Sequence, residues 1–221
     1  MINTQSGRSM VEMLGVLAII GVLSVGAIAG YSKAMFKYKL NKQAESFSML
    51  LNEAIMLLPD LERHYGKNVT TRNNLNDFFY KANLLPDGMT YNAADNRIYD
   101  IFKNKILLHY TMSTHGDGST STDYYMAIET NHAGGTISGQ NNEICRNIFL
   151  VAKENAQNIL SIEMRSTRTD GYSTVILRGG RHPTSNTLSK ASIKQINDTC
   201  SSCNAEKGCE IFLVINEAPN P

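Results

Sequence analysis

Four cysteines carry the clearest chemistry in this sequence of 221 residues: Cys145, Cys200, Cys203 and Cys209. An even number of cysteines in a small domain is typical of disulfides formed in an oxidising compartment, and four cysteines allow three pairings. The Cys200-x-x-Cys203 spacing, with Cys209 as a further thiolate, also suits zinc, but no second C-x-x-C and no neighbouring His pair completes such a site. A thioredoxin-like redox role is disfavoured because no β-α-β pattern surrounds the motif. We therefore expect disulfides and no metal site.

No other set of residues has the spacing of a catalytic or cofactor site. The histidines are scattered singly, and Asp117, Gly118 and Asp123 lack the spacing of an EF-hand loop, so a polar loop is the simpler interpretation. Nucleophile-elbow, phosphate-loop and dinucleotide-binding motifs are all missing from the sequence. We expect a protein that is not an enzyme and has no cofactor. The histidines are His64, His109, His115, His132 and His182.

The charge is nearly balanced, with 21 Lys and Arg against 20 Asp and Glu. This balance excludes a global basic field for nucleic acid and an acidic disordered chain. Lys33, Lys37, Lys39 and Lys42 form a local basic group that could attract anionic lipid or DNA, although a solvated helix face is the plainer interpretation. We do not expect nucleic acid as the main partner, and these lysines leave that alternative open.

The apolar residues concentrate near the N-terminus. Residues 10–31 contain one charged residue, Glu12, and about 20 helical residues suffice to cross the roughly 30 Å of a bilayer's hydrocarbon. Residues 32–65 contain no Gly and a single proline, Pro59, and their apolar residues recur at helical spacing. We predict one helix over about residues 9–58. Its first half, residues 8–31, would lie in a membrane; its second half, residues 32–58, would be amphipathic; and residues 59–221 would form a head.

The head is predicted to combine helices with an antiparallel sheet, which makes the chain an α+β protein whose long N-terminal helix packs on that sheet. Short runs rich in Ile, Val, Tyr and Phe, bounded by turn-forming residues, are typical of strands. Lys103 and Asn104 indicate a hairpin between the first two. The expected strands are 97–102, 105–112, 123–129, 172–177 and 210–216. The expected helices are 74–85, 142–155 and 188–197, the last capped by Ser189, and the expected polar loops are 111–122 and 179–186.

The N-terminus resembles the prepilin motif of type IV pilins and type II secretion pseudopilins. A short polar leader ends at Gly7, Glu12 lies four residues beyond Arg8, and the long apolar segment follows. The resemblance implies that prepilin peptidase cleaves between Gly7 and Arg8 and N-methylates Arg8, so that residues 1–7 are a leader peptide. The plan of long helix, sheet and late cysteines extends the likeness to the whole chain, and the cysteine-bounded C-terminal region looks most like the type IVb pilins.

The resemblance implies a structural role as the subunit of a homopolymeric filament for adhesion, motility, aggregation or DNA uptake. The prepilin would lie in the bacterial inner membrane with its head in the periplasm, and an assembly platform and a cytoplasmic ATPase would extrude the filament. The product would be an extracellular pilus or a periplasmic pseudopilus. Glu12 would pair with the N-terminal amine of a neighbouring subunit, because an unpaired carboxylate is disfavoured in an apolar filament core. Among the three pairings we favour Cys145–Cys200 with Cys203–Cys209, which ties the middle helix to the C-terminal region as in these pilins.

Two alternatives remain open at the level of the sequence. The first is a minor pilin, or a pseudopilin of a type II secretion system. The second is a membrane-anchored or secreted periplasmic binding or enzymatic domain, because Ala27-Ile28-Ala29 resembles a signal-peptidase site. Orientation is also contested: Lys33 and its neighbours favour a cytoplasmic head by the positive-inside rule, whereas the cysteines favour an oxidising compartment.

Overall fold

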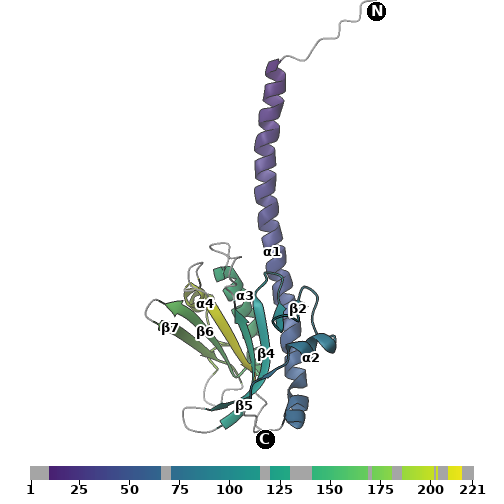
Figure 1. Ribbon diagram of the computed structural model, residues 1–221. Coiled ribbons are helices and arrows are strands. Elements are labelled where there is room, and N and C mark those ends of the chain that lie inside the picture. The colour runs from purple at the N-terminus through teal and green to yellow at the C-terminus, as the bar shows by residue number, and fades with distance from the viewer. Residues whose placement is uncertain are drawn as a thin grey trace, which may run out of the picture. The chain divides into compact units, whose positions relative to one another are not determined.

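The computed structural model describes residues 10–65, 71–114, 120–129, 141–168, 171–180, 186–201, 203 and 209–215. The chain divides into two compact units, Met1–Lys39 and Leu40–Pro221. The first unit contains the N-terminal part of a long helix, and the second contains the rest of that helix together with an antiparallel sheet and shorter helices (Figure 1). The α+β class and the long N-terminal helix that we expected are therefore confirmed.

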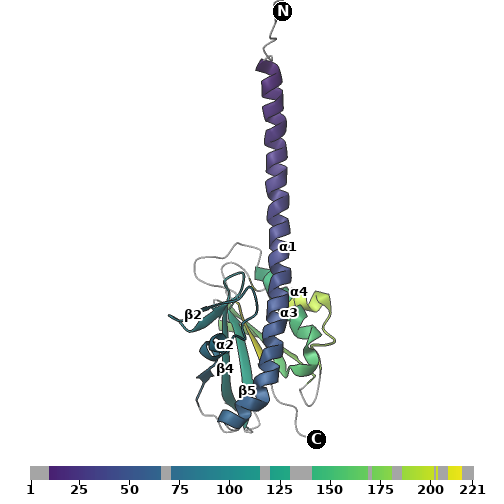
Figure 2. The same cartoon turned by 90° about the vertical axis from the view of Figure 1, so that its right-hand side faces the viewer.

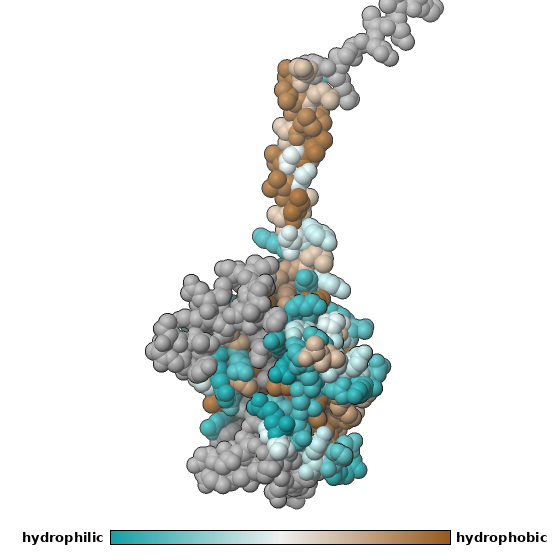
Figure 3. Space-filling model, in the orientation of Figure 1, coloured by the Kyte–Doolittle hydropathy of each residue, from teal (hydrophilic) through white to brown (hydrophobic). Residues whose placement is uncertain are grey.

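Helix α1 extends over Met10–Tyr65 and is 56 residues long. In the first unit, apart from Glu12 and Ser24, its side chains as far as Tyr31 are apolar on all sides of the helix. They are exposed, as Figure 3 shows by the brown colour along this part of the helix. By length and composition this is a helix that could cross a membrane. A helix that is apolar all round needs either lipid or other protein around it, because water solvates such a surface poorly.

In the second unit, α1 buries one face against the head. The buried positions follow one another at intervals of three and four residues, as in an amphipathic helix. They are Gln43, Ser46, Phe47, Leu50, Leu51, Ala54, Leu58 and Leu61. The prediction that the helix ends at residue 58 is wrong. Proline has no N–H to donate to the carbonyl of Ile55, but Pro59 lies on the exposed side of the helix, where water can solvate that carbonyl. The last turns are held in place because Leu58 and Leu61, on either side of the proline, are buried.

The strands form a single antiparallel sheet in the order β2-β3-β4-β5-β8-β6-β7, with the short β1 paired to β4. The last strand in the sequence thus lies in the middle of the sheet, between β5 and β6. The strands are β1 (Asn73–Asn74), β2 (Thr90–Asn92), β3 (Arg97–Tyr99), β4 (Lys105–Thr114), β5 (Thr120–Glu129), β6 (Ser161–Arg168), β7 (Gly171–Arg178) and β8 (Cys209–Ile215). The remaining helices are α2 (Asn76–Lys81), α3 (Asn141–Glu154), a 3₁₀ turn (Ala156–Asn158) and α4 (Ile193–Cys200).

Several elements differ from the sequence prediction. Strand β6 was not predicted, because most of its residues are polar. Its side chains nevertheless alternate between the two faces of the sheet: Ile162 and Met164 are buried, and Arg165 is exposed. The polar loop predicted for 111–122 is wrong at both ends: Thr111–Thr114 pairs with Thr120–Asp123, since threonine is a good strand former. Helix α2 is shorter than predicted, because Asn74 pairs with His109 in the sheet.

The cap of α4 also differs from the prediction. Ser192, and not Ser189, precedes the helix, and its hydroxyl accepts a hydrogen bond from the backbone N–H of Gln195 at 3.1 Å. Both serines lie just before a helical pattern, so sequence alone could not separate them. The bond satisfies one of the unpaired N–H groups at the helix start, which explains why the helix begins at Ile193.

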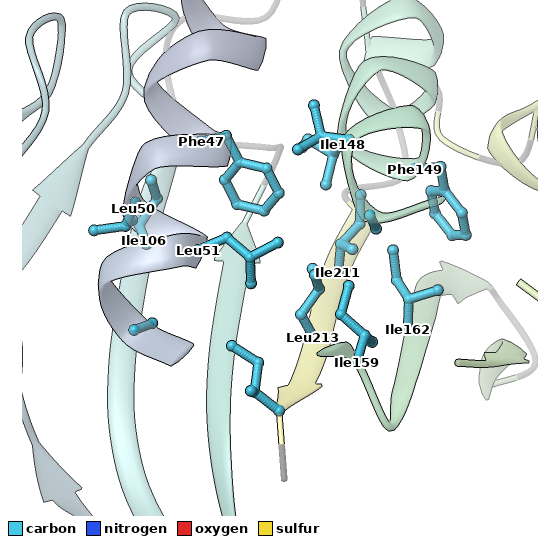
Figure 4. Packing of buried hydrophobic residues seen from close by; sticks show 14 of the residues in the cluster. Phe47, Leu50, Leu51, Ile106, Ile148, Phe149, Ile159, Ile162, Ile211 and Leu213 are labelled. Atoms are coloured by element: carbon cyan, nitrogen blue, oxygen red, sulfur yellow. The ribbon is translucent and has the colours of Figure 1, made fainter. Parts of the chain in front are cut away.

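One hydrophobic core joins the sheet to helices α1, α3 and α4. Figure 4 shows Phe47 and Leu51 of α1 facing Ile148 of α3, with Leu213 of β8 beneath them. The same face of the sheet supplies Ile106, Leu108 and Tyr110 of β4, Ile162 and Met164 of β6, and Ile211, Leu213 and Ile215 of β8. The second view in Figure 2 shows α1 passing beside α3, and Asn147 of α3 donates hydrogen bonds to Leu40 and Gln43 of α1. The head is thus a helical layer on one face of a sheet.

Candidate functional site

The candidate site is the first unit of α1, where the structure places one acidic side chain in an apolar segment. Glu12 lies in the first turn of the helix, and large apolar side chains such as Val11 and Val22 are about three-quarters exposed (76% and 75%). Gly7 and Arg8, the expected cleavage and methylation residues, lie outside the described residues. A carboxylate in the first turn also suits the positive end of the helix dipole.

Four glycines interrupt the apolar segment. A Cβ atom added at Gly15, Gly21, Gly26 or Gly30 would meet nothing within 4 Å, so these positions leave shallow gaps in the helix surface. At about 100° per residue, Glu12, Gly15, Gly26 and Gly30 fall within roughly 60° of arc on one side of the helix. Small residues spaced in this way let two helix backbones approach closely in an apolar environment. The one carboxylate of the apolar segment therefore lies on the same side of the helix as three glycines, where no side chains project from the backbone.

The cysteines form two disulfides in the head. Cys145 of α3 is joined to Cys200 of α4, and Cys203 is joined to Cys209 at the start of β8. This is the pairing favoured from the resemblance. All four residues are buried, and the Sγ atom of Cys203 lies 3.4 Å from the Sδ atom of Met164. With this pairing, none of the four cysteines is left as a free thiol. Within the described residues, no three His, Cys, Asp or Glu side chains are grouped as a metal site.

A buried polar cluster that could not be predicted from the sequence connects α1 to the rest of the head. Asp100 is 3% exposed, and its carboxylate accepts four hydrogen bonds. Oδ1 accepts from the backbone N–H groups of Phe102 and Asn104, both at 2.8 Å, and Oδ2 accepts from the side-chain amides of Asn104 at 2.8 Å and Gln43 at 2.6 Å. Burial raises the pKa of Asp100, and these hydrogen bonds act in the opposite direction.

The cluster continues from Gln43 to α3. The Nδ2 atom of Asn147 donates to Oε1 of Gln43 at 3.0 Å and to the backbone carbonyl of Leu40 at 2.9 Å. Three elements distant in the sequence, namely α1, the turn between β3 and β4, and α3, are thereby fixed to one another. A buried polar network of this kind tolerates little displacement, because each amide would lose its partner. The start of the head's portion of α1 is held by hydrogen bonds as well as by packing.

Replacing Asp100 with Asn should destabilise the head by about 3 kcal/mol. Both carboxylate oxygens accept hydrogen bonds from N–H donors. The amide nitrogen of Asn is itself a donor, so in either orientation it would face N–H groups from which it cannot accept. Urea unfolding of the full chain in detergent, followed by circular dichroism, measures the loss. Asp87→Asn is the matched control, because Asp87 is exposed and uses only its backbone carbonyl, to accept from Ser46. Equal stability of the two variants would contradict this description of the cluster.

His109 makes the stability of the head depend on pH. Burial lowers the pKa of this histidine to about 4, and the charges of Arg72 and Arg97 act in the same direction. The folded head therefore favours the neutral ring, whereas the unfolded chain titrates near 6.5. The stabilisation is complete above pH 6.5 and is lost as the pH falls from 6.5 to about 4.

We expect the free energy of unfolding to fall by about 3 kcal/mol from this group between pH 7 and pH 4. His109→Gln should reduce that fall, while His64→Gln, at an exposed position, should leave it unchanged. Denaturant unfolding of the unaltered chain and the two variants at a series of pH values provides the comparison. The carboxylates contribute equally to the pH dependence of all three proteins, so their contribution drops out of the differences. An identical pH dependence in His109→Gln and the unaltered chain would contradict the assignment.

Comparison with known proteins identifies no relative: no protein-family model, no curated protein and no solved structure matches the chain significantly. The structure by itself defines an α+β protein with a long apolar N-terminal helix and a disulfide-linked head.

Proposed function

We propose that this chain is the structural subunit of a type IV pilus-like filament. Prepilin peptidase would remove residues 1–7, and the mature chain would polymerise through the N-terminal part of α1. The observation that carries the proposal is the combination of Gly7, Arg8 and Glu12 with an apolar helical segment that directly follows them. Each feature alone is common, but together they provide a cleavage site, a new amine and a carboxylate about one helical turn apart.

The physical properties of α1 support polymerisation through helix packing. An exposed apolar segment is stable in lipid, and transfer from lipid into a bundle of similar helices brings little hydrophobic gain, so packing and polar contacts must provide specificity. The glycines supply close approach, and Glu12 supplies a polar contact on the same side of the helix. In the mature subunit the amine of Arg8 would be the partner of that carboxylate in a neighbouring copy.

The disulfides support a head in an oxidising compartment. Two buried disulfides would be unusual in a reduced cytosol and are ordinary in the periplasm or outside the cell. This argues for a prepilin that lies in the inner membrane with its head in the periplasm, despite the lysines that follow the apolar run. The partners in assembly would be other copies of the chain, an inner-membrane platform and a cytoplasmic ATPase.

Electron microscopy of filaments sheared from expressing cells, with mass spectrometry of the purified material, tests the proposal. We expect filaments in which this chain is the major component. Filaments that contain the chain only in trace amounts would identify a minor pilin, and a polymer confined to the periplasm would identify a pseudopilin. A chain that remains monomeric while the cells assemble no filament from it would contradict the proposal.

A further inference from the structure

A group of aromatic and basic side chains follows directly on the apolar run of α1. We call Tyr31, Lys33, Lys37, Tyr38 and Lys39 the collar. Lys33 and Lys37 are exposed, Lys39 is half-buried, and the two tyrosines are 67% and 58% exposed. All five lie in the first compact unit on one continuous helix, and they span about 12 Å at roughly 1.5 Å per residue.

The positive charges of the collar have no acidic counterpart along the helix. No Asp or Glu occurs in residues 13–44, so none of the three lysines has a carboxylate three or four residues away. The next lysine differs in this respect, because the Nζ atom of Lys42 forms an ion pair with Glu45 at 3.2 Å. Along the helix, therefore, no neighbouring carboxylate offsets the positive charges of these three lysines.

The geometry of a helix directs the collar toward the apolar run. Side chains of a helix tilt toward its N-terminus, so the long lysine side chains can extend back over the residues that precede them. The polar layer of one leaflet is about 5–7 Å thick, and lysines within about 12 Å of the hydrocarbon can bring their ammonium groups into it. Tyrosine rings settle at the same level, with the ring in apolar surroundings and the hydroxyl in water. Figure 3 shows the change from brown to hydrophilic colours along the helix.

We propose that the collar binds the phosphate groups of anionic phospholipids in the leaflet at the C-terminal end of the apolar run. A net negative headgroup complements three uncompensated ammonium groups, whereas a zwitterionic headgroup brings a cation of its own that the lysines repel. The proposal rests on the membrane stage of the proposed function and not on polymerisation. Its consequence is that the collar sets the depth of the prepilin helix and must release its lipids when a subunit leaves the membrane.

Lipid selectivity of the full chain tests the proposal. The chain is placed in nanodiscs that contain equal amounts of phosphatidylglycerol and phosphatidylcholine, and native mass spectrometry counts the lipids that remain bound after release. We expect phosphatidylglycerol to be retained about fivefold over phosphatidylcholine, and the preference to vanish in the triple variant Lys33→Gln, Lys37→Gln, Lys39→Gln. The matched control Lys103→Gln, Lys190→Gln, Lys194→Gln removes the same charge from exposed positions in the head and should keep the preference.

Two results would overturn the proposal. The first is an equal preference in the triple variant and the unaltered chain; if that variant also no longer forms filaments, the lysines contact another copy of the chain instead of lipid. The second is a loss of preference in the control, which would indicate a bulk charge effect. Insertion without lipid selectivity refutes only the collar, whereas a chain that does not enter the nanodisc refutes the membrane stage on which the proposal rests.

Discussion

Glu12→Ala should abolish filament assembly, with at least about a 100-fold loss of sheared filaments, while leaving removal of the leader intact. In the proposed filament core the carboxylate of Glu12 neutralises the amine of Arg8 in a neighbouring subunit. Removing one member of a buried ion pair leaves the other uncompensated and costs about 3–5 kcal/mol, which corresponds to a change of about two to nearly four orders of magnitude in an equilibrium constant. Immunoblots of sheared material measure assembly, and the mass of the cellular subunit reports cleavage.

The substitution separates assembly from membrane insertion. Alanine makes the apolar segment more apolar, so the variant should accumulate in the membrane at the normal level. Glu45→Ala is a suitable control on the same helix, because Glu45 forms only an exposed pair with Lys42, and such pairs contribute about 0–1 kcal/mol. Normal filaments from Glu12→Ala, or equal losses in both variants, would contradict the role that we assign to Glu12.

Removal of the Cys145–Cys200 disulfide should lower the free energy of unfolding by about 4 kcal/mol. This disulfide closes a loop across a sequence separation of 55, and the entropy that a cross-link removes from the unfolded chain grows with the loop. The double variant Cys145→Ser, Cys200→Ser avoids a free thiol. Urea unfolding of the full chain in detergent measures the change.

The second disulfide provides the internal control. Cys203–Cys209 spans a separation of 6, so Cys203→Ser, Cys209→Ser should cost only about 2 kcal/mol. If the first double variant does not fold, peptide mapping without reductant still tests the pairing, because a Cys145–Cys200 linkage gives a cross-linked peptide pair of defined mass. Equal costs of the two double variants, or a linkage of Cys145 to Cys203 or Cys209, would contradict this description.

The long helix could be predicted because local chemistry determines it. A run of 22 residues, 10–31, with one charge is helical in lipid whatever follows it, and the three-and-four spacing of Phe47, Leu50 and Leu51 continues the same helix into the head. The end of the helix was misjudged because Pro59 is a helix breaker in isolation. Burial of Leu61 beyond it, which is a property of the tertiary structure, decides otherwise.

The polar cluster could not be predicted because it depends on contacts between distant residues. Gln43 and Asp100 are 57 positions apart, and Gln43 and Asn147 are 104 positions apart. Their residue types are ordinary for a surface, and only the fold brings them together away from water. Asn104 gave a partial signal, since it is one of the two residues that indicated a hairpin, but nothing local shows that the carboxylate of Asp100 is buried. Strand β6 was missed for a related reason, because its buried residues are separated by charged ones.

The mass and N-terminal sequence of the mature protein test the central claim most directly. The proposed function predicts a chain that begins at Arg8, with residues 1–7 removed and a methyl group on the new amine. A chain that begins at Gly30, after Ala27-Ile28-Ala29, would identify a conventional secretory signal peptide, and one that still begins at Met1 would show that no leader is removed. Either of the last two results would contradict the assignment to a pilus-like filament.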